Sequence, residues 1–322
     1  MIITRTPFRV SFVGGGSDLK DFYSQNGYGA VVSTAINKYM YIAIHPYFHD
    51  KIRLKYSKTE DVKSIDEIQH PIVRECLKKV QIENGIEIAS FADVPAGTGL
   101  GSSSSFAVGL LNALYAYKGK TVSKEKLAQE ACEIEIDSLG EPIGKQDQYA
   151  AAYGNINYIK FNKDETVDVS PILLTEPLKK ALEECFCLYH IGGERRASDI
   201  LSEQKNNIAI EDKYQNLKKM VMLASELRDA FLDEKLETVG AILHRGWLYK
   251  KELASNISNS DIDDLYNTAL KYDAIGGKLL GAGGTGFFLI YSKDHKQLQK
   301  HLGCRVLPFR IDREGTKIIF YE

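Results

Sequence analysis

A glycine- and serine-rich tract has residue types that suit the binding of an anion. It runs from Pro95 to Ser105, after an apolar segment typical of a strand and before a segment with a helical pattern. Glycines let backbone N–H groups turn toward a ligand, and the start of a helix adds free donors and the positive end of its dipole. Serine hydroxyls can bond phosphate oxygens or coordinate Mg²⁺. We therefore predict a phosphate-binding loop here rather than a flexible linker, which would be expected between domains.

Three familiar nucleotide-binding patterns do not fit the chain. No Lys follows Gly101, which excludes the P-loop. Residues 281–286 satisfy G-x-G-x-x-G, but they precede a predicted strand at 287–291, where a dinucleotide fold requires a helix. His244-Arg245-Gly246 lacks the aspartate of the protein-kinase catalytic loop.

Two carboxylates are candidates for chemistry. On a helix predicted to begin at Ser123, helical spacing places Glu135 inside the apolar arc, whereas Glu130 and Glu133 lie opposite it, as solvated charges. An inward carboxylate needs a cation or a strong donor, so we expect Glu135 to face either Mg²⁺ or a buried Lys or Arg. Asp147 lies beside Lys145 in a polar segment and could be a base held by a neighbouring cation, or an ordinary loop aspartate.

The elements that would position these residues alternate between strand and helix patterns without a steady βαβ repeat. This mixture predicts an α+β fold, with domains at 1–172 and 173–322. Residues 2–48 predict strands, interrupted by Gly14-Gly15-Gly16 and a short helix. Further strands are predicted at 86–91, 155–161, 167–170, 185–191, 287–291, 305–311 and 316–321. Helices are predicted at 68–84, 104–117, 123–137, 200–233, 234–254, 261–272 and 295–302.

Composition excludes several classes of partner. The 322 residues include 41 Lys and Arg against 43 Asp and Glu, a net charge of −2, which argues against a general nucleic-acid coat. Five cysteines without a C-x-x-C pair favour reduced thiols. No segment has the apolar length of a membrane span or the pattern of a secretory signal. We expect a cytoplasmic protein that binds a small molecule, with no nucleic-acid or membrane partner, and a homodimer as one possible assembly.

Three motifs in this order resemble those of the GHMP kinase superfamily, which transfers the γ-phosphoryl group of ATP to a small-molecule hydroxyl. The first motif is matched by residues 7–18, the phosphate loop P-x-x-x-G-L-G-S-S by residues 95–103, and the third by residues 278–284. The resemblance spans the chain and implies a two-domain α+β kinase fold, with ATP and Mg²⁺.

The resemblance also implies roles for individual residues. Ser103 and Glu135 match the Mg²⁺ ligands, Asp147 the catalytic aspartate, and Arg9 the basic residue that steadies the phosphoryl group, with Lys145 as a second candidate for that role. The implied ATP-binding residues are Pro95, Gly97, Gly99, Leu100, Gly101, Ser102, Ser103, Ser104 and Ser105. The implied substrate-binding residues are Gly15, Gly16, Ser17, Asp18, Arg195, Arg196, Gly283 and Gly284.

The variant V-G-G-G-S-D at residues 13–18, with residues 140–149, is most similar to the D-glycero-D-manno-heptose 7-phosphate kinases of bacteria. That resemblance implies phosphorylation of the anomeric hydroxyl to give a 1,7-bisphosphate, on the route to nucleotide-activated heptose. Arg195 and Arg196, at the predicted end of a strand, would receive the 7-phosphate, unless they are solvated or form an interdomain salt bridge. A kinase of L-fucose, a uronic acid or galactose, and a non-catalytic sugar and ATP sensor, are the alternatives.

Overall fold

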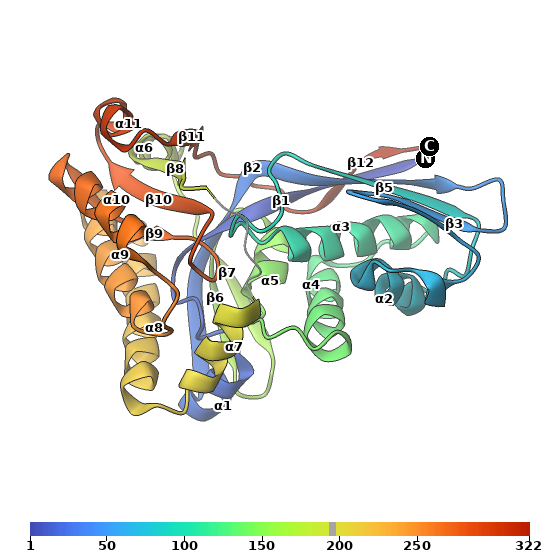
Figure 1. Cartoon of the computed structure of the whole chain (residues 1–322), viewed down its shortest axis with the longest axis horizontal. Coiled ribbons are helices and arrows are strands. Elements are labelled where there is room, and N and C mark those ends of the chain that lie inside the picture. The colour runs from blue at the N-terminus through green and yellow to red at the C-terminus, as the bar shows by residue number, and fades with distance from the viewer. Residues whose placement is uncertain (193–197) are drawn as a thin grey trace.

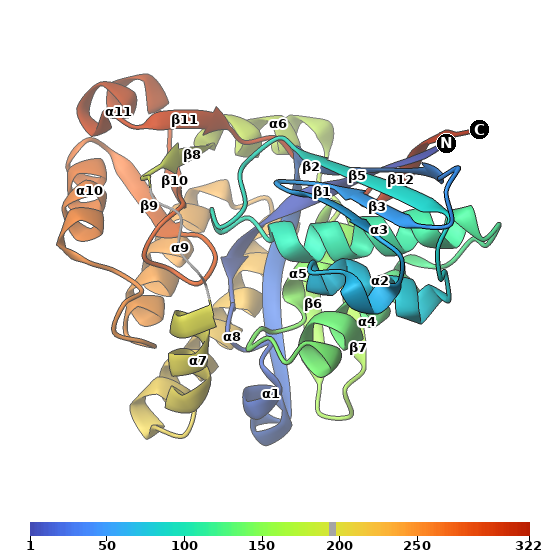
Figure 2. The same cartoon turned by 45° about the vertical axis from the view of Figure 1, so that its right-hand side comes forward.

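The computed structural model describes residues 1–192 and 198–322, which fold into two sheets covered by helices (Figure 1, Figure 2). In these residues the larger sheet has eight strands in the order β12-β1-β2-β5-β3-β4, and β2 also pairs with β6, which pairs with β7. Its strands are β1 (Ile2–Val13), β2 (Tyr28–Pro46), β3 (Ile52–Lys55), β4 (Thr59–Val62), β5 (Ile86–Ala92), β6 (Ile156–Asn162), β7 (Val167–Pro171) and β12 (Lys317–Tyr321). Because β12 is antiparallel to β1, the two ends of the chain lie side by side (Figure 1).

The smaller sheet has the order β11-β8-β10-β9 in the described part of the chain. Its strands are β8 (Phe186–His190), β9 (Ala274–Leu279), β10 (Phe287–Ser292) and β11 (Arg305–Pro308). The sequence has three glycine tracts, residues 14–16, 97–101 and 281–286, and the third lies in the connection between the antiparallel strands β9 and β10. The tract therefore leads into a strand, as predicted, and opens no helix.

Helices cover the two sheets and fall into two groups along the chain. The first group is α1 (Lys20–Asn26), η1 (Ile65–Glu67), α2 (Pro71–Val80), α3 (Ser102–Tyr117), α4 (Lys124–Cys132), the π-helical segment η2 (Glu133–Ser138) and α5 (Gln146–Tyr153). The second group is α6 (Glu176–Cys185), α7 (Ser198–Asn207), α8 (Glu211–Leu232), α9 (Leu236–Lys251), α10 (Ser260–Lys271) and α11 (His295–Leu302). Figure 1 shows α3 along the larger sheet, with α2 and α4 on the side of α3 away from that sheet, and α9 and α10 beside the smaller sheet.

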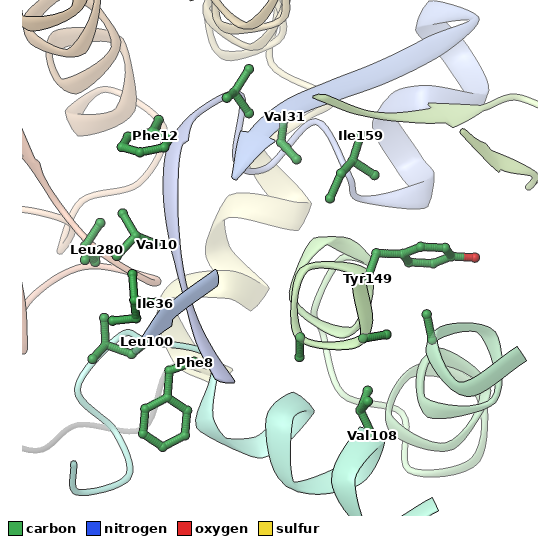
Figure 3. Close-up of a cluster of buried hydrophobic side chains, with 14 of the residues drawn as sticks. Phe8, Val10, Phe12, Val31, Ile36, Leu100, Val108, Tyr149, Ile159 and Leu280 are labelled. Carbon is green, nitrogen blue, oxygen red and sulfur yellow. The ribbon is translucent and has the colours of Figure 1, made fainter. Parts of the chain in front are cut away.

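The core forms where β1 meets helix α3 and the smaller sheet. Helix α3 is apolar on almost every side and packs against β1 and β2, as expected of a buried helix. Phe12 on β1 is fully buried, and its ring lies 5.4 Å from that of Phe186 and 6.1 Å from that of Phe309. Figure 3 shows Phe8, Val10 and Phe12 following β1 through this core. The strand that carries Arg9 is thus held rigidly by packing.

The turn after β1 requires glycine. Gly14 has φ +91°, and a Cβ placed there would lie 2.0 Å from the carbonyl oxygen of Ala30 on β2. A side chain at this position would both strain the backbone and push the two strands apart. Gly14 therefore brings residues 15–18 close to β2 and to the site described below.

The structure confirms the α+β prediction and most predicted elements, with differences at several segments. The helix expected at 200–233 is two helices, α7 and α8, while α5, α6, β3, β4 and β9 were not predicted. Helix α5 was missed because residues 146–153 are small or polar and have no apolar periodicity. The boundary between 172 and 173 stays a prediction. Among the described residues, none of the helices combines the length and the apolar character that a membrane crossing requires.

Candidate active site

The three glycine tracts meet around a cavity of about 330 Å³. Its walls come from β1 and the turn after it, from the loop before α3, from the start of α5, from α7, and from the hairpin between β9 and β10. The predicted site residues that line it are Arg9, Gly15, Gly16, Asp18, Gly97, Gly99, Gly101, Ser102, Ser103, Ser104, Asp147 and Gly283. Segments that are far apart in the sequence therefore form one site.

The predicted phosphate loop is a series of left-handed glycines that ends at a helix. Gly97, Gly99 and Gly101 have φ of +77°, +82° and +73°, and α3 begins at Ser102. The first N–H groups of a helix have no acceptor within it, so residues 102–104 present donors and hydroxyls at the cavity wall. An anion placed there would also meet the positive end of the α3 dipole.

The phosphate loop and the third glycine tract are in direct backbone contact. A Cβ on Gly281 would lie 2.5 Å from Gly99 Cα, and one on Gly99 would lie 2.6 Å from the carbonyl oxygen of Leu280. Lys250 on α9 fixes this contact, because its buried ammonium donates hydrogen bonds to the carbonyl oxygens of Leu279 (2.8 Å) and Gly281 (2.6 Å). The third tract is thus a second wall of the phosphate site.

Arg9 and Asp147 form a bidentate ion pair inside the cavity. Arg9 Nε donates to Asp147 Oδ1 at 2.7 Å, and Arg9 Nη2 donates to Asp147 Oδ2 at 2.8 Å. Arg9 Nη1 donates to the carbonyl oxygen of Gly99 at 2.5 Å, and only 4% of Arg9 is exposed. Asp147 lies in the first turn of α5, not in a loop. The cation beside Asp147 is therefore Arg9, which also fastens the carboxylate to the phosphate loop.

Asp18 lies next to this pair and is held by donors from two segments. Its Oδ1 accepts from the Gly16 N–H at 2.8 Å, and its Oδ2 accepts from the Gln146 N–H at 3.2 Å. Burial, and then the charge of Asp147, raise the pKa of Asp18 above its ordinary value. A Cβ on Gly144 would lie 2.0 Å from Asp18 Oδ2, so glycine is needed there for Asp18 to pack. This carboxylate is placed to accept hydrogen bonds from a hydroxylated ligand.

Glu135 is buried, as predicted, and belongs to the π-helical segment that continues α4. Its Oε2 accepts from Gln148 Nε2 at 2.6 Å. Burial raises the pKa of Glu135 to about 7, and the nearby polar side chains of Ser104, Gln148 and Ser103 oppose this rise. Ser104 Oγ and Gln148 Oε1 are buried without a hydrogen-bond partner in the described residues. These unpartnered oxygens beside a carboxylate and a helix N-terminus form a donor set that fits a hard cation such as Mg²⁺.

Glu130 corrects the helical-spacing argument. We predicted it as a solvated charge, but it is 8% exposed and accepts hydrogen bonds from the Tyr115 hydroxyl at 2.9 and 2.7 Å. Helical spacing gives only the direction of a side chain, and here α3 supplies a polar partner in that direction. The predicted start of the helix at Ser123 is confirmed: Ser123 caps α4, and its hydroxyl accepts from the Lys126 N–H at 3.1 Å.

Replacing Glu135 by Gln should stabilise the metal-free protein at alkaline pH. The pKa of Glu135 is about 7 in the folded state, against an ordinary value of 4.5. The folded state therefore binds more protons between these pH values, and ionisation of Glu135 lowers stability as pH rises. We expect Glu135→Gln to raise the free energy of unfolding at pH 8 by about 1–3 kcal/mol, with little change near pH 4.5. Urea denaturation in a chelating buffer at both pH values measures this, with exposed Glu141→Gln as control. An equal loss of stability at both pH values would contradict it.

Several predicted site residues lie elsewhere. Lys145 precedes α5 and points away from Asp147. It faces a neighbouring cavity, where its Nζ donates to the carbonyl oxygen of Glu165 at 3.3 Å. Ser17 is buried and bonded to the backbone of Ala30. The remaining predicted residues, which do not line the site cavity, are Pro95, Leu100, Ser105, Glu135 and Gly284. Arg195 and Arg196 lie outside the described residues.

Two buried lysines were missed by the sequence analysis. Lys250 and Lys278 both line the cavity, and they are 7% and 4% exposed. Burial lowers the pKa of Lys278 to about 7, helped by the charge of Arg9 and opposed by Asp18. The available signal was weak: Lys278 is a single charge in the otherwise apolar and glycine-rich segment 274–280.

Comparisons with known proteins identify relatives of this chain. The model of the GHMP kinases N terminal domain matches residues 69–155, and that of the GHMP kinases C terminal domain matches residues 227–307, together about half of the chain. A D-glycero-alpha-D-manno-heptose 7-phosphate kinase of Campylobacter jejuni is 28% identical over 337 residues, covering 98% of each chain. A bifunctional fucokinase/GDP-fucose pyrophosphorylase of Arabidopsis thaliana is 28% identical over 91% of this chain and 30% of its own length.

A solved structure supports the fold. The crystal structure of a D-glycero-D-manno-heptose 1-phosphate kinase from Bacteroides thetaiotaomicron superposes with a TM-score of 0.82, covering 100% of both chains at 23% identity. At this identity the likeness concerns the arrangement of sheets and helices.

Proposed function

This chain belongs to the GHMP kinase family, and on that premise we propose that it phosphorylates the anomeric hydroxyl of D-glycero-D-manno-heptose 7-phosphate with ATP. The enzyme is a phosphotransferase with an alcohol group as acceptor, and kinases of this family use ATP as the donor. The product would be the 1,7-bisphosphate, on the route to nucleotide-activated heptose. The full-length similarity to the heptose 7-phosphate kinase of Campylobacter jejuni supports this acceptor.

The observation that carries the proposal is the position of Asp147 between two kinds of binding group. On one side, Arg9 fastens it to the phosphate loop through the carbonyl oxygen of Gly99. On the other, its charge acts on Asp18, whose carboxylate suits sugar hydroxyls. A nucleotide at the loop and a sugar at Asp18 would therefore meet at Asp147, and positioning of this kind supplies a large part of kinase catalysis.

The transfer balances as a direct displacement. The sugar O1 forms a bond to the γ-phosphorus while the bond from that phosphorus to the β–γ bridging oxygen breaks, and its electrons leave with ADP. The O1 proton moves to an Oδ atom of Asp147, where each oxygen keeps a lone pair beyond its contact with Arg9. Arg9 also offers positive charge to the phosphoryl group in flight.

A magnesium ion would be held by Glu135 and the Ser103 hydroxyl, next to the unpartnered oxygens of Ser104 and Gln148. When bound, the ion would neutralise charge on the β- and γ-phosphates. The chain's own residues prepare this site through the hydrogen bond from Gln148 to Glu135. The roles of Arg195 and Arg196 as receptors of the 7-phosphate, the homodimer and the cytoplasmic location remain predictions.

A substrate panel tests the function. We expect ADP release with heptose 7-phosphate to exceed that with unphosphorylated heptose by at least about 10²-fold in kcat/KM, because charge-assisted bonds to the phosphate would be lost. Phosphorus NMR of the product should show a phosphate on C1. A preference for L-fucose, galactose or a uronic acid would overturn the heptose assignment but keep a sugar kinase. Binding of ATP and sugar without ADP release from any sugar would favour a sensor.

A further inference from the structure

Lys278 is a buried cation without a partner in the described part of the chain. It lies on β9, in register with Leu289 of β10, and only 4% of its surface is exposed. The hydrogen bonds and ion pairs among residues 1–192 and 198–322 include none made by its ammonium, although the side chain lines the site cavity. By contrast, the other buried lysine, Lys250, donates to two carbonyl oxygens. A mostly buried lysine whose side chain lines a cavity is suited to an anionic partner in that cavity.

The groups around Lys278 leave positive charge in excess. Beyond the effect of burial, the positive charge of Arg9 lowers the pKa of Lys278, and the charge of Lys278 lowers the pKa of Lys250. Of the two carboxylates at this wall, Asp147 is engaged by both arms of the Arg9 guanidinium. Asp18 is engaged by backbone donors and the Gln146 amide. Among the described residues, three basic side chains thus line the cavity, and both carboxylates that line it are already engaged by other donors.

We propose that Lys278 binds the phosphoryl group that is being transferred, together with Arg9, and is a catalytic residue of this kinase. The inference rests on the proposed function and deepens it. The phosphate loop and Asp147 are both tied to Arg9, so the cation pair lies where donor and acceptor meet. The 7-phosphate of the sugar is separated from the reacting O1 by the length of the sugar, so it would lie away from this point.

Kinetics of Lys278 variants give the first test. Lys278→Met should lower kcat by about 10²–10³-fold, the effect of removing one preorganised donor, while KM for ATP changes only a few-fold. Lys278→Arg should recover part of kcat, since it restores the charge. Lys293→Met, at an exposed lysine, is the matched control and should behave as wild type. A Lys278→Met enzyme that keeps kcat within a few-fold of wild type would overturn the proposal.

Folding of the variant separates chemistry from structure. Removing an unpaired buried charge should leave the thermal midpoint of Lys278→Met at or above that of wild type. A purely structural lysine would instead lower both the midpoint and the activity, and Lys278→Arg would then restore the two together. That outcome would overturn the catalytic assignment.

Proton uptake on ligand binding tests Lys278 even if no sugar is phosphorylated. With a pKa of about 7 when no ligand is bound, most Lys278 side chains carry a neutral amine at pH 8, and a bound phosphoryl group should draw a proton onto that amine. Calorimetry at pH 8 in buffers of different ionisation enthalpy should show uptake approaching one proton with a non-hydrolysable ATP analogue. The uptake should be smaller with ADP and absent in Lys278→Met.

The remaining outcomes are distinguishable. Equal uptake in wild type and Lys278→Met overturns the assignment of Lys278 while leaving the kinase function intact. Uptake with a sugar phosphate alone, and none with the ATP analogue, also overturns it, because Lys278 would then serve the acceptor. Normal uptake with no transfer to any sugar in the panel contradicts the proposed function and leaves the phosphate contact of Lys278 standing.

Discussion

Replacing Asp147 by Asn is expected to lower kcat by about 10²–10⁴-fold, the range that loss of a positioned proton acceptor produces. Asparagine keeps the size of the side chain but cannot take the O1 proton, and it offers only one oxygen to the two arms of Arg9. ATP binding should change little, because the phosphate loop and the start of α3 are untouched. Steady-state kinetics with heptose 7-phosphate, and titration with a fluorescent ATP analogue, measure the two effects separately.

A matched control makes the Asp147 result specific. Asp264→Asn removes an exposed carboxylate on α10 that does not line the site cavity, and it should leave kcat unchanged. If Asp147→Asn kept kcat within a few-fold of wild type, proton transfer to Asp147 would be wrong, and positioning by the phosphate loop would account for the catalysis. If both kcat and nucleotide binding collapsed, Asp147 would act through the loop that Arg9 holds.

The phosphate loop could be predicted from sequence because all of its determinants are local. Glycines that adopt left-handed backbone, serines and the start of a buried helix follow one another within residues 95–105. The structure begins α3 at Ser102, two residues earlier than predicted, which places Ser103 in the first turn. Local composition thus predicts a binding loop but leaves the helix boundary uncertain by a few residues.

The partner of Asp147 could not be predicted in the same way. Lys145 is its neighbour in sequence, whereas Arg9 is 138 positions away and reaches it only because β1 crosses the core between the loop and α5. Proximity along the chain therefore favoured the wrong cation. The general expectation of a carboxylate held by a positive charge was sound, but the identity of that charge depends on tertiary packing.

The buried lysines show a second limit of sequence patterns. A lysine is normally a surface residue; the spacing of Lys250 gives no sign of burial, and the apolar and glycine-rich neighbours of Lys278 give only a weak one. Their position follows from the β9–β10 hairpin, which places Leu280 and Gly281 against Gly99, and from α9, which brings Lys250 to the same hairpin. Glu130 was misjudged for the same reason, since its partner Tyr115 lies on another helix. Patterns indicate which way a side chain points, and the fold decides what it meets.

Removing Arg9 should lower kcat about as much as removing Asp147, and removing both should lower kcat little more than either single change. Arg9→Met is expected to lower kcat by about 10²–10³-fold, because the variant loses the guanidinium that holds Asp147 and Gly99. If the two residues act as one unit, the double variant Arg9→Met/Asp147→Asn should stay within a few-fold of the poorer single variant. The measurement is a double-mutant cycle, which compares kcat of the wild type, the two single variants and the double variant at saturating substrates.

The result for Arg9→Lys decides what the arginine contributes. Lysine keeps the positive charge but cannot bond both oxygens of Asp147 and the Gly99 carbonyl together, so kcat should remain at least about 10-fold below wild type. Recovery of full activity would mean that charge alone matters and that the bidentate geometry is incidental. If the fold-loss in kcat of the double variant equalled the product of the two single losses, Arg9 and Asp147 would act independently, with Arg9 on the phosphoryl group and Asp147 on the proton. Non-additive losses together with a poor Arg9→Lys enzyme would instead identify the ion pair itself as the element that aligns donor and acceptor.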